Sequence, residues 1–125
     1  MNESDPEVLN EAVLHHLEAS VQGDRAFIAD LVETYLSDGA SHVVDVVVAI
    51  AAGDASALVR PAHTLKSSSA TVGAERLAAM ARSLEVAGRS GSIESEGEDE
   101  GAQVQQAWAE AADALRAWIQ RGDGG

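Results

Sequence analysis

The chain has 125 residues, of which 46% are hydrophobic, and a net charge of −13. This is enough for one small domain with a single core. Such an acidic chain repels phosphate backbones and anionic lipids, which argues against nucleic acid or a membrane surface as a partner. The lack of cysteine excludes disulfides, thiolate zinc sites and a cysteine nucleophile. No apolar run approaches the roughly 20 residues of a membrane-spanning helix, and the N-terminus shows no secretory signal, so we expect a cytoplasmic protein.

Apolar residues recur at helical spacing along most of the chain. Alanine, the best helix former, fills 24 positions. The first predicted helix starts at Pro6, which follows a capping Asp5, and it ends before Gly23. A second helix is predicted to start near Arg25, after the capping Asp24.

The run from Ser41 to Gly53 is rich in valine, which is typical of strands. Its apolar residues nevertheless repeat at spacings of three and four, and no other segment offers a partner strand. Because a lone strand would leave its backbone groups unpaired, we predict that this run is helical. Gly39 is expected to weaken the second helix.

Three further helices are predicted. One spans residues 55–70, after the capping Asp54, and contains Pro61, which we expect to kink it or to remove one backbone hydrogen bond. The next spans residues 74–87 and is closed by Gly88 and Gly91. The last spans residues 103–121.

Residues 91–101 hold five acids, three glycines and two serines, which predicts a flexible, self-repelling loop. In the last helix, Trp108 and Trp118 are expected as core or edge anchors, and the tail from Gly122 is expected to fray. Five helices joined by short connections predict a single all-α domain over residues 1–125. We expect an antiparallel up-and-down four-helix bundle with an additional N-terminal helix.

His63 is expected on the outer face of the helix over residues 55–70. On a wheel of about 100° per residue, one buried stripe collects Leu58, Ala62, Leu65, Ser69 and Val72. His63 lies about 140° from the centre of that stripe. Lys66 and Ser67 follow it at i+3 and i+4 and share its face, so the sequence predicts a histidine that is displayed rather than packed.

The charge distribution singles out the same segment. Residues 60–89 hold five bases and two acids, a net charge of +3, whereas the rest of the chain has a net charge of −16. Lys66 is the only lysine. This setting suits a histidine that carries or meets an anion.

Neutral imidazole is a nucleophile at physiological pH, and its ring nitrogen can accept a phosphoryl group whose oxygens Lys66 could hold. The residue before Lys66 is Leu65, so the GK[ST] of a Walker loop is missing, and no GxGxxG occurs. We therefore expect a domain that receives a phosphoryl group and passes it on.

The stretch from Ala62 to Glu85 resembles the histidine-containing phosphotransfer (HPt) domains of bacterial phosphorelays. Their H-x-L-K-G-like motif, followed by a glycine near the helix end, is matched here by His63, Leu65, Lys66 and Gly73. The usual glycine at i+4 is replaced by Ser67. The resemblance extends loosely over residues 24–87.

This resemblance implies that His63 is the phospho-accepting residue, that Lys66 stabilises the phosphoryl group and that Ser67 serves as a small docking residue. It also implies a monomeric carrier without a nucleotide site or kinase activity of its own. The implied partners are response-regulator receiver domains and a hybrid histidine kinase. The chain would need no cofactor, with Mg²⁺ supplied by the receiver. The dimerisation helices of sensor kinases also display a histidine, but an acid usually follows it, where this chain has Thr64.

Other interpretations remain open at this level. The domain could be a helical adaptor that binds a receiver or another signalling partner without accepting phosphate, or His63 could be an exposed histidine without function. His15, His16 and His42 lack the cationic setting. A metal site from His15 or His16 with Glu11 or Glu18 has helical spacing but no evident third ligand.

Overall fold

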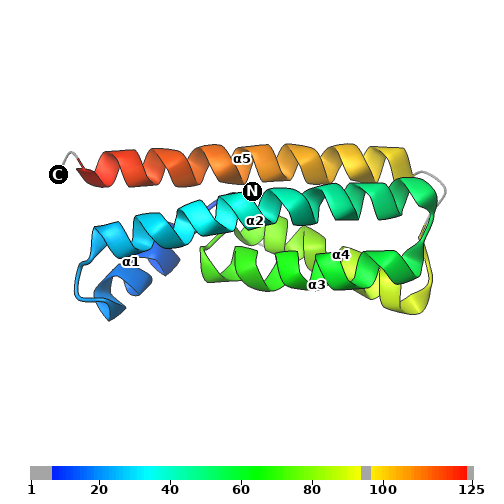
Figure 1. Cartoon of the computed structure of the whole chain (residues 1–125), viewed down its shortest axis with the longest axis horizontal. Helices are drawn as coiled ribbons and strands as arrows, with labels where there is room; N and C mark the ends of the chain where they lie inside the picture. The colour runs from blue at the N-terminus through cyan, green and yellow to red at the C-terminus, as the bar shows by residue number, and fades with distance from the viewer. Residues whose placement is uncertain (1–6, 94–96, 124–125) are drawn as a thin grey trace, which may run out of the picture.

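The computed structural model describes residues 7–93 and 97–123, and all regular structure in these ranges is helical. The helices are, in chain order, α1 (Glu11–Ser20), α2 (Arg25–Ala52), α3 (Ala55–Thr71), α4 (Glu75–Ser90) and α5 (Gly97–Asp123). Figure 1 shows α2 and α5 side by side along the molecule, with α3 and α4 against one half of this pair and α1 at the other end. The predicted all-α bundle with an additional N-terminal helix is confirmed.

The helix starts at Arg25 and Ala55 are fixed by the predicted aspartate caps. The side chains of Asp24 and Asp54 accept hydrogen bonds from the backbone N–H groups of Phe27 and Ala57 at 3.0 and 3.1 Å. Each bond satisfies one of the donors that a helix start leaves unpaired. α2 and α3 therefore begin where the sequence predicts.

The start of α1 differs from the prediction. The helix begins at Glu11 rather than at Pro6, which lies outside the described residues. Residues 7–10 run along the turn between α3 and α4 instead. The N–H of Asn10 donates to the carbonyl of Gly73 at 2.7 Å, and the N–H of Arg76 donates to the carbonyl of Glu7 at 2.8 Å. These long-range bonds replace the first helical turn.

α2 runs without a break through the valine-rich segment and through Gly39. Gly39 is buried, and a Cβ atom there would lie 2.5 Å from Cη2 of Trp108 in α5. Trp118 is buried, and the partly buried Trp108 packs on the core with its ring 5.4 Å from that of Tyr35. Both tryptophans are therefore packing anchors, as predicted, and Gly39 makes room for one of them.

By length and composition alone, α2 would be able to cross a bilayer, with a mean hydropathy of 1.3 over 18 residues. A core helix of a soluble protein meets the same criterion, and α2 packs here against α3 and α5. One third of that window is buried inside the bundle, and Phe27, Val44 and Val48 of α2 are exposed apolar residues.

α3 buries the predicted stripe, which consists of Leu58, Ala62, Leu65, Ser69 and Val72. The buried hydroxyl groups of Ser69 and Tyr35 are hydrogen-bonded to each other at 2.7 Å. Burial raises the pKa of Tyr35 to about 12, although the bond to Ser69 opposes this shift. Pro61 is buried within α3, which continues on both sides of it.

Three helix boundaries in the second half of the chain differ from the prediction. α4 continues through Gly88 and ends at Ser90, with Gly91 as its left-handed cap. α5 begins at Gly97, so residues 97–101 are helical and the loop prediction is wrong for them; residues 94–96 lie outside the described residues. Acidic residues suit the positive end of a helix dipole, and the buried Gly101 faces Val47 of α2. α5 also extends to Asp123, beyond the predicted end.

Candidate functional site

His63 lies on the outer face of α3, beside α4. Its side chain is 53% exposed, which confirms the exposure that the helical wheel predicts. The ring is not free, however, because Nδ1 lies 2.9 Å from Oε2 of Glu85 in α4. One edge of the imidazole is therefore fixed by a neighbouring helix.

Glu85 is the centre of this site. Its side chain is only 7% exposed, and both of its oxygens are engaged. Oε1 receives the ammonium of Lys66 at 2.7 Å. Oε2 receives Nη2 and Nε of Arg89 at 2.7 and 3.1 Å, in addition to the imidazole of His63. One carboxylate thus joins the two helices through three partners.

These contacts fix the protonation of the carboxylate. The hydrogen bond from Lys66 and then that from Arg89 lower the pKa of Glu85 to about 2, and the bond to His63 adds to them; burial acts in the opposite direction. At neutral pH Glu85 is therefore ionised, and an ionised carboxylate only accepts hydrogen bonds.

The charge of Glu85 decides the tautomer of His63. Because Glu85 can only accept, Nδ1 of His63 must carry the proton that it shares. In the neutral ring the other nitrogen, Nε2, then holds the lone pair. The site therefore offers a nucleophilic nitrogen on a half-exposed side chain.

The close approach of α3 and α4 allows side chains of α3 to contact Glu85 of α4. A Cβ atom on Gly88 would lie 2.9 Å from Cγ2 of Val59 and 3.0 Å from the carbonyl oxygen of Ala55. The helices meet at this glycine, one turn after Glu85. The close contact of the two helices brings Glu85 within reach of both His63 and Lys66.

The structure brings two of the three predicted site residues together. Lys66, 32% exposed, reaches the same carboxylate as His63. Ser67 is exposed on α3, and its carbonyl accepts a hydrogen bond from Thr71 Oγ1 at 3.0 Å. Its side chain forms no part of the Glu85 network, and the roles of these three residues stay predictions.

Glu85 and Arg89 were not among the sequence-predicted site residues. A signal was available, because they form an acid–base pair at i and i+4, and Glu85 is one of only two acids in the basic segment 60–89. That spacing indicates their mutual contact. It does not indicate a contact with His63, which lies 22 residues away in the chain.

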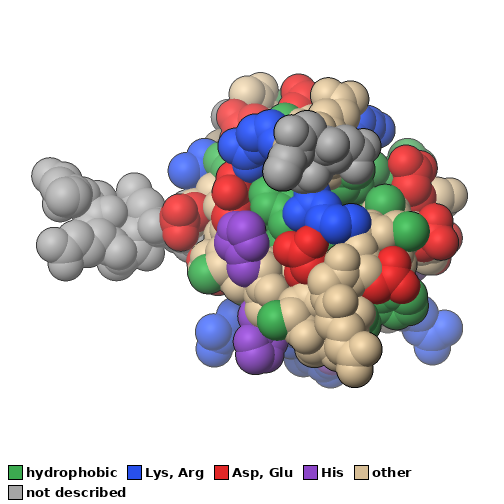
Figure 2. All heavy atoms as spheres, turned by 90° about the vertical axis from the view of Figure 1, so that its left-hand side faces the viewer, with side chains coloured by type: hydrophobic (Ala, Val, Ile, Leu, Met, Phe, Trp, Pro, Cys, Tyr) green, Lys and Arg blue, Asp and Glu red, His purple; other side chains and the backbone are tan. Residues whose placement is uncertain are grey.

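The remaining histidines lie elsewhere. His15 and His16 are exposed on α1. Figure 2 shows the end of the bundle at which α1 lies, where histidine, acidic and basic side chains share the surface. The ring of His15 lies edge-on to Trp118, 6.0 Å away, and His42 is half-buried between α2 and α3. Within the described ranges, no three His, Asp or Glu side chains are grouped to hold a metal ion.

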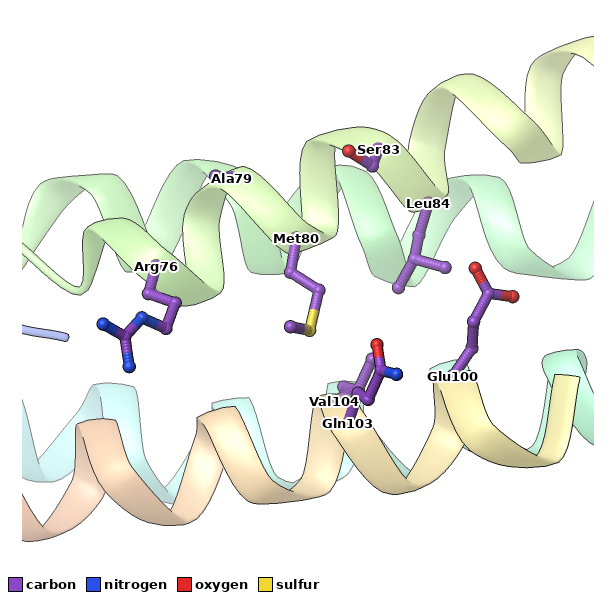
Figure 3. A pocket seen from close by; sticks show the side chains of 8 residues that line it. All are labelled: Arg76, Ala79, Met80, Ser83, Leu84, Glu100, Gln103 and Val104. Carbon is purple, nitrogen blue, oxygen red and sulfur yellow. The ribbon is translucent and has the colours of Figure 1, made fainter. Parts of the chain in front are cut away.

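A cavity of about 340 Å³ opens between α4 and α5, away from this site (Figure 3). Met80 and Leu84 point from α4 toward α5 across it, and Arg76 lies at one end. None of the residues of the Glu85 network lines this cavity. The network lies instead on an open surface of α3 and α4, which a protein partner can approach.

A helical bundle that displays a histidine beside a lysine is the arrangement expected of a histidine phosphotransfer domain, and the comparisons agree. The family model of the Hpt domain matches residues 30–118, so the chain belongs to this family. Among solved structures, it is similar to histidine-containing phosphotransfer protein B from Pseudomonas aeruginosa PAO1. The identity is 26% and the TM-score 0.79, over 91% of this chain and 96% of that one. A comparison with curated protein sequences gives no significant match.

Membership confirms the predicted resemblance and its coarse consequences. The chain has a histidine phosphotransfer role in a phosphorelay, in a family of carriers rather than enzymes with a nucleotide site. Hpt domains interact with receiver domains and histidine kinases. The family match also extends beyond the predicted range of residues 24–87, into α5.

Proposed function

We propose that Nε2 of His63 accepts a phosphoryl group from a receiver aspartyl phosphate or a histidine kinase, and that it passes this group to the aspartate of another receiver. The chain acts as a monomeric cytoplasmic carrier and needs no cofactor of its own. One observation carries this proposal. The bond between Nδ1 of His63 and Glu85 leaves the lone pair on Nε2, on a side chain that is 53% exposed.

The transfer balances without an added acid or base. The lone pair of Nε2 attacks phosphorus, the bond from phosphorus to the aspartate oxygen breaks, and the aspartate leaves as a carboxylate with the electron pair. Nε2 carries no proton, so none has to be removed. The ring gains positive charge as the N–P bond forms, and Glu85 stabilises this charge through Nδ1. The onward transfer is the reverse of this step.

Lys66 supplies the charge for the phosphoryl oxygens. Its ammonium lies one turn from His63 and is bound to Oε1 of Glu85 in the unphosphorylated chain. A phosphoryl group carries more negative charge than a carboxylate, so it competes for this lysine. The receiver supplies Mg²⁺ for its own acidic pocket.

Transfer from phosphorylated receivers tests this function. The chain is incubated with a panel of radiolabelled receivers, and the transferred label is tested for stability in acid and in alkali. A phosphohistidine is labile in acid and stable in alkali, whereas an acyl phosphate is lost in both. We expect acid-labile, alkali-stable label on the parent chain.

His63→Gln should take up no label, and its stability should fall by about 1.5 kcal/mol at most, the net contribution of the one hydrogen bond to Glu85. The exposed His16 provides the control, because His16→Gln should be labelled like the parent. Acid-labile label on His63→Gln would place the acceptor elsewhere. Receiver binding without any label on the parent would instead support the helical adaptor.

A further inference from the structure

Arg89 and His63 share one oxygen of Glu85. Nη2 and Nε of Arg89 lie 2.7 and 3.1 Å from Oε2, and Nδ1 of His63 lies 2.9 Å from the same atom. Lys66 binds the other oxygen, Oε1, at 2.7 Å. The two cations therefore hold the carboxylate in different ways, and only Arg89 holds the oxygen that binds the imidazole.

Lys66 and Arg89 also differ in how easily each can move away from Glu85. Lys66 is a point charge on a flexible stem, on the same helix as His63. Arg89 follows Glu85 by one turn on α4 and directs two donors of its rigid guanidinium at one atom. Lys66 can therefore turn toward a group on His63 while Arg89 stays on Glu85.

Phosphorylation makes this difference matter. A phosphoryl group brings a charge of about −1.5 to −2 and draws Lys66 away from Glu85. The Glu85 side chain is only 7% exposed, and a buried carboxylate without a counterion is strongly disfavoured. A second cation is needed if Glu85 is to stay ionised and bound to Nδ1.

On the basis of the proposed function, we propose that Arg89 is a positioning residue that acts through Glu85. It remains the counterion of Glu85 when Lys66 moves to the phosphoryl group. It thereby keeps the carboxylate directed at Nδ1 of His63, and it keeps Nε2 as the nitrogen that gains and loses the phosphoryl group. Lys66 is the exchangeable cation and Arg89 the permanent one.

The ring tautomer of His63 gives a direct measurement in the unphosphorylated protein. Two-bond ¹⁵N–¹H correlation spectra at mildly alkaline pH report which ring nitrogen carries the proton. The parent should show the proton on Nδ1. Arg89→Gln should raise the share of the Nε2–H tautomer, because Glu85 is held less firmly, and Arg89→Lys should restore the parent spectrum in part.

Arg82→Gln is the matched control. Arg82 is exposed on the same helix, and no ion pair to it is found within the described part of the chain. Its loss changes the net charge equally, so an effect of charge alone would alter the tautomer in both variants. We expect Arg82→Gln to keep the parent tautomer. Both arginine variants are also measured in a Lys66→Met background, in which Arg89 is the remaining cation on Glu85. A tautomer that Arg89→Gln leaves unchanged in this background would overturn the proposal.

A double-mutant cycle separates action through Glu85 from direct action. Arg89→Gln should slow phosphoryl uptake roughly two- to fivefold, as for the loss of an exposed ion pair. In a Glu85→Gln background it should have no further effect. An undiminished effect there would mean that Arg89 acts on the phosphoryl group or on the receiver, and the proposal would be wrong. A parent chain that takes up no label would contradict the proposed function. A His63 tautomer that does not change when Arg89 is replaced in the Lys66→Met background would contradict this inference.

Discussion

Asn10 and Gly73 are in backbone contact although about half of the chain separates them. The N–H of Asn10 donates to the carbonyl of Gly73 at 2.7 Å, and a Cβ atom on Gly73 would lie 2.6 Å from the carbonyl oxygen of Asn10. Gly73 also has a φ of +83°, in the left-handed region that favours glycine. Gly73 therefore serves both the turn after α3 and the docking of the segment before α1.

Gly73→Ala should lower the free energy of unfolding by about 2–4 kcal/mol, since it combines left-handed strain with a backbone clash. Gly53→Ala is the control, because Gly53 also has a positive φ but a Cβ there would meet open space. The control should cost only about 1–2 kcal/mol. Urea unfolding measures both variants. Equal losses would show that the contact with Asn10 adds nothing.

The effect of Gly39→Ala on stability should depend on Trp108: it should be destabilising when Trp108 is present and stabilising when Trp108 is replaced. In the parent, the new methyl group meets the Trp108 ring, and overpacking of about 1–3 kcal/mol outweighs the gain of about 0.5–1 kcal/mol in helix propensity. With Trp108→Leu as the background, only the gain should remain, and the same substitution should stabilise the protein. Thermal unfolding of the parent, the two single variants and the double variant tests this. A destabilising effect of the same size in both backgrounds would contradict it.

Glu85 should make stability depend on acidity. Its pKa falls from 4.5 to about 2 on folding, so the folded state binds this proton more weakly than the unfolded state does. The resulting stabilisation is complete above the unfolded pKa and is lost as the pH falls from about 4.5 to about 2. Glu85→Gln should lose this part of the pH dependence, and Lys66→Met should lose some of it. Urea midpoints between pH 2 and pH 6 measure the difference, and a Glu85→Gln profile parallel to that of the parent would contradict the assignment.

Lys66→Ala should slow phosphoryl transfer without abolishing it. The change removes one charge-assisted contact to the phosphoryl oxygens. The free energy of such a contact is about 1.5 kcal/mol at the lower end of its range, which corresponds to a rate about tenfold slower. The rate of label loss from the phosphorylated chain to a receiver is the measurement. The helix should remain intact, because alanine is a better helix former than lysine. A rate equal to that of the parent would mean that Lys66 is a bystander.

What the sequence could predict is local. The exposure of His63 follows from the period of one helix, and the aspartate caps act within three residues of themselves, so both could be read without knowing the fold. The contact of His63 with Glu85 is different. It depends on how closely two helices approach, and that approach is set by Gly88 against Val59, a pair that no spacing rule connects.

The two displaced helix starts have the same kind of cause. Residues 97–101 have the composition of a loop, but Gly101 packs on α2, and acids are favoured in a first helical turn. The residues after Pro6 have a helix-start signal, but Glu7 and Asn10 bind the turn after α3 instead. In both places tertiary contacts override the local preference.

The segment before α1 also has a consequence for the order of assembly. Asn10 and its side-chain partner Glu75 lie 65 residues apart, and Glu7 finds its partner at Arg76. At roughly 5–20 residues per second, a ribosome makes the two sides of this contact several seconds apart. Through that interval the segment before α1 has no binding site, so α1 joins a bundle in which α3 and the turn after it have already been made.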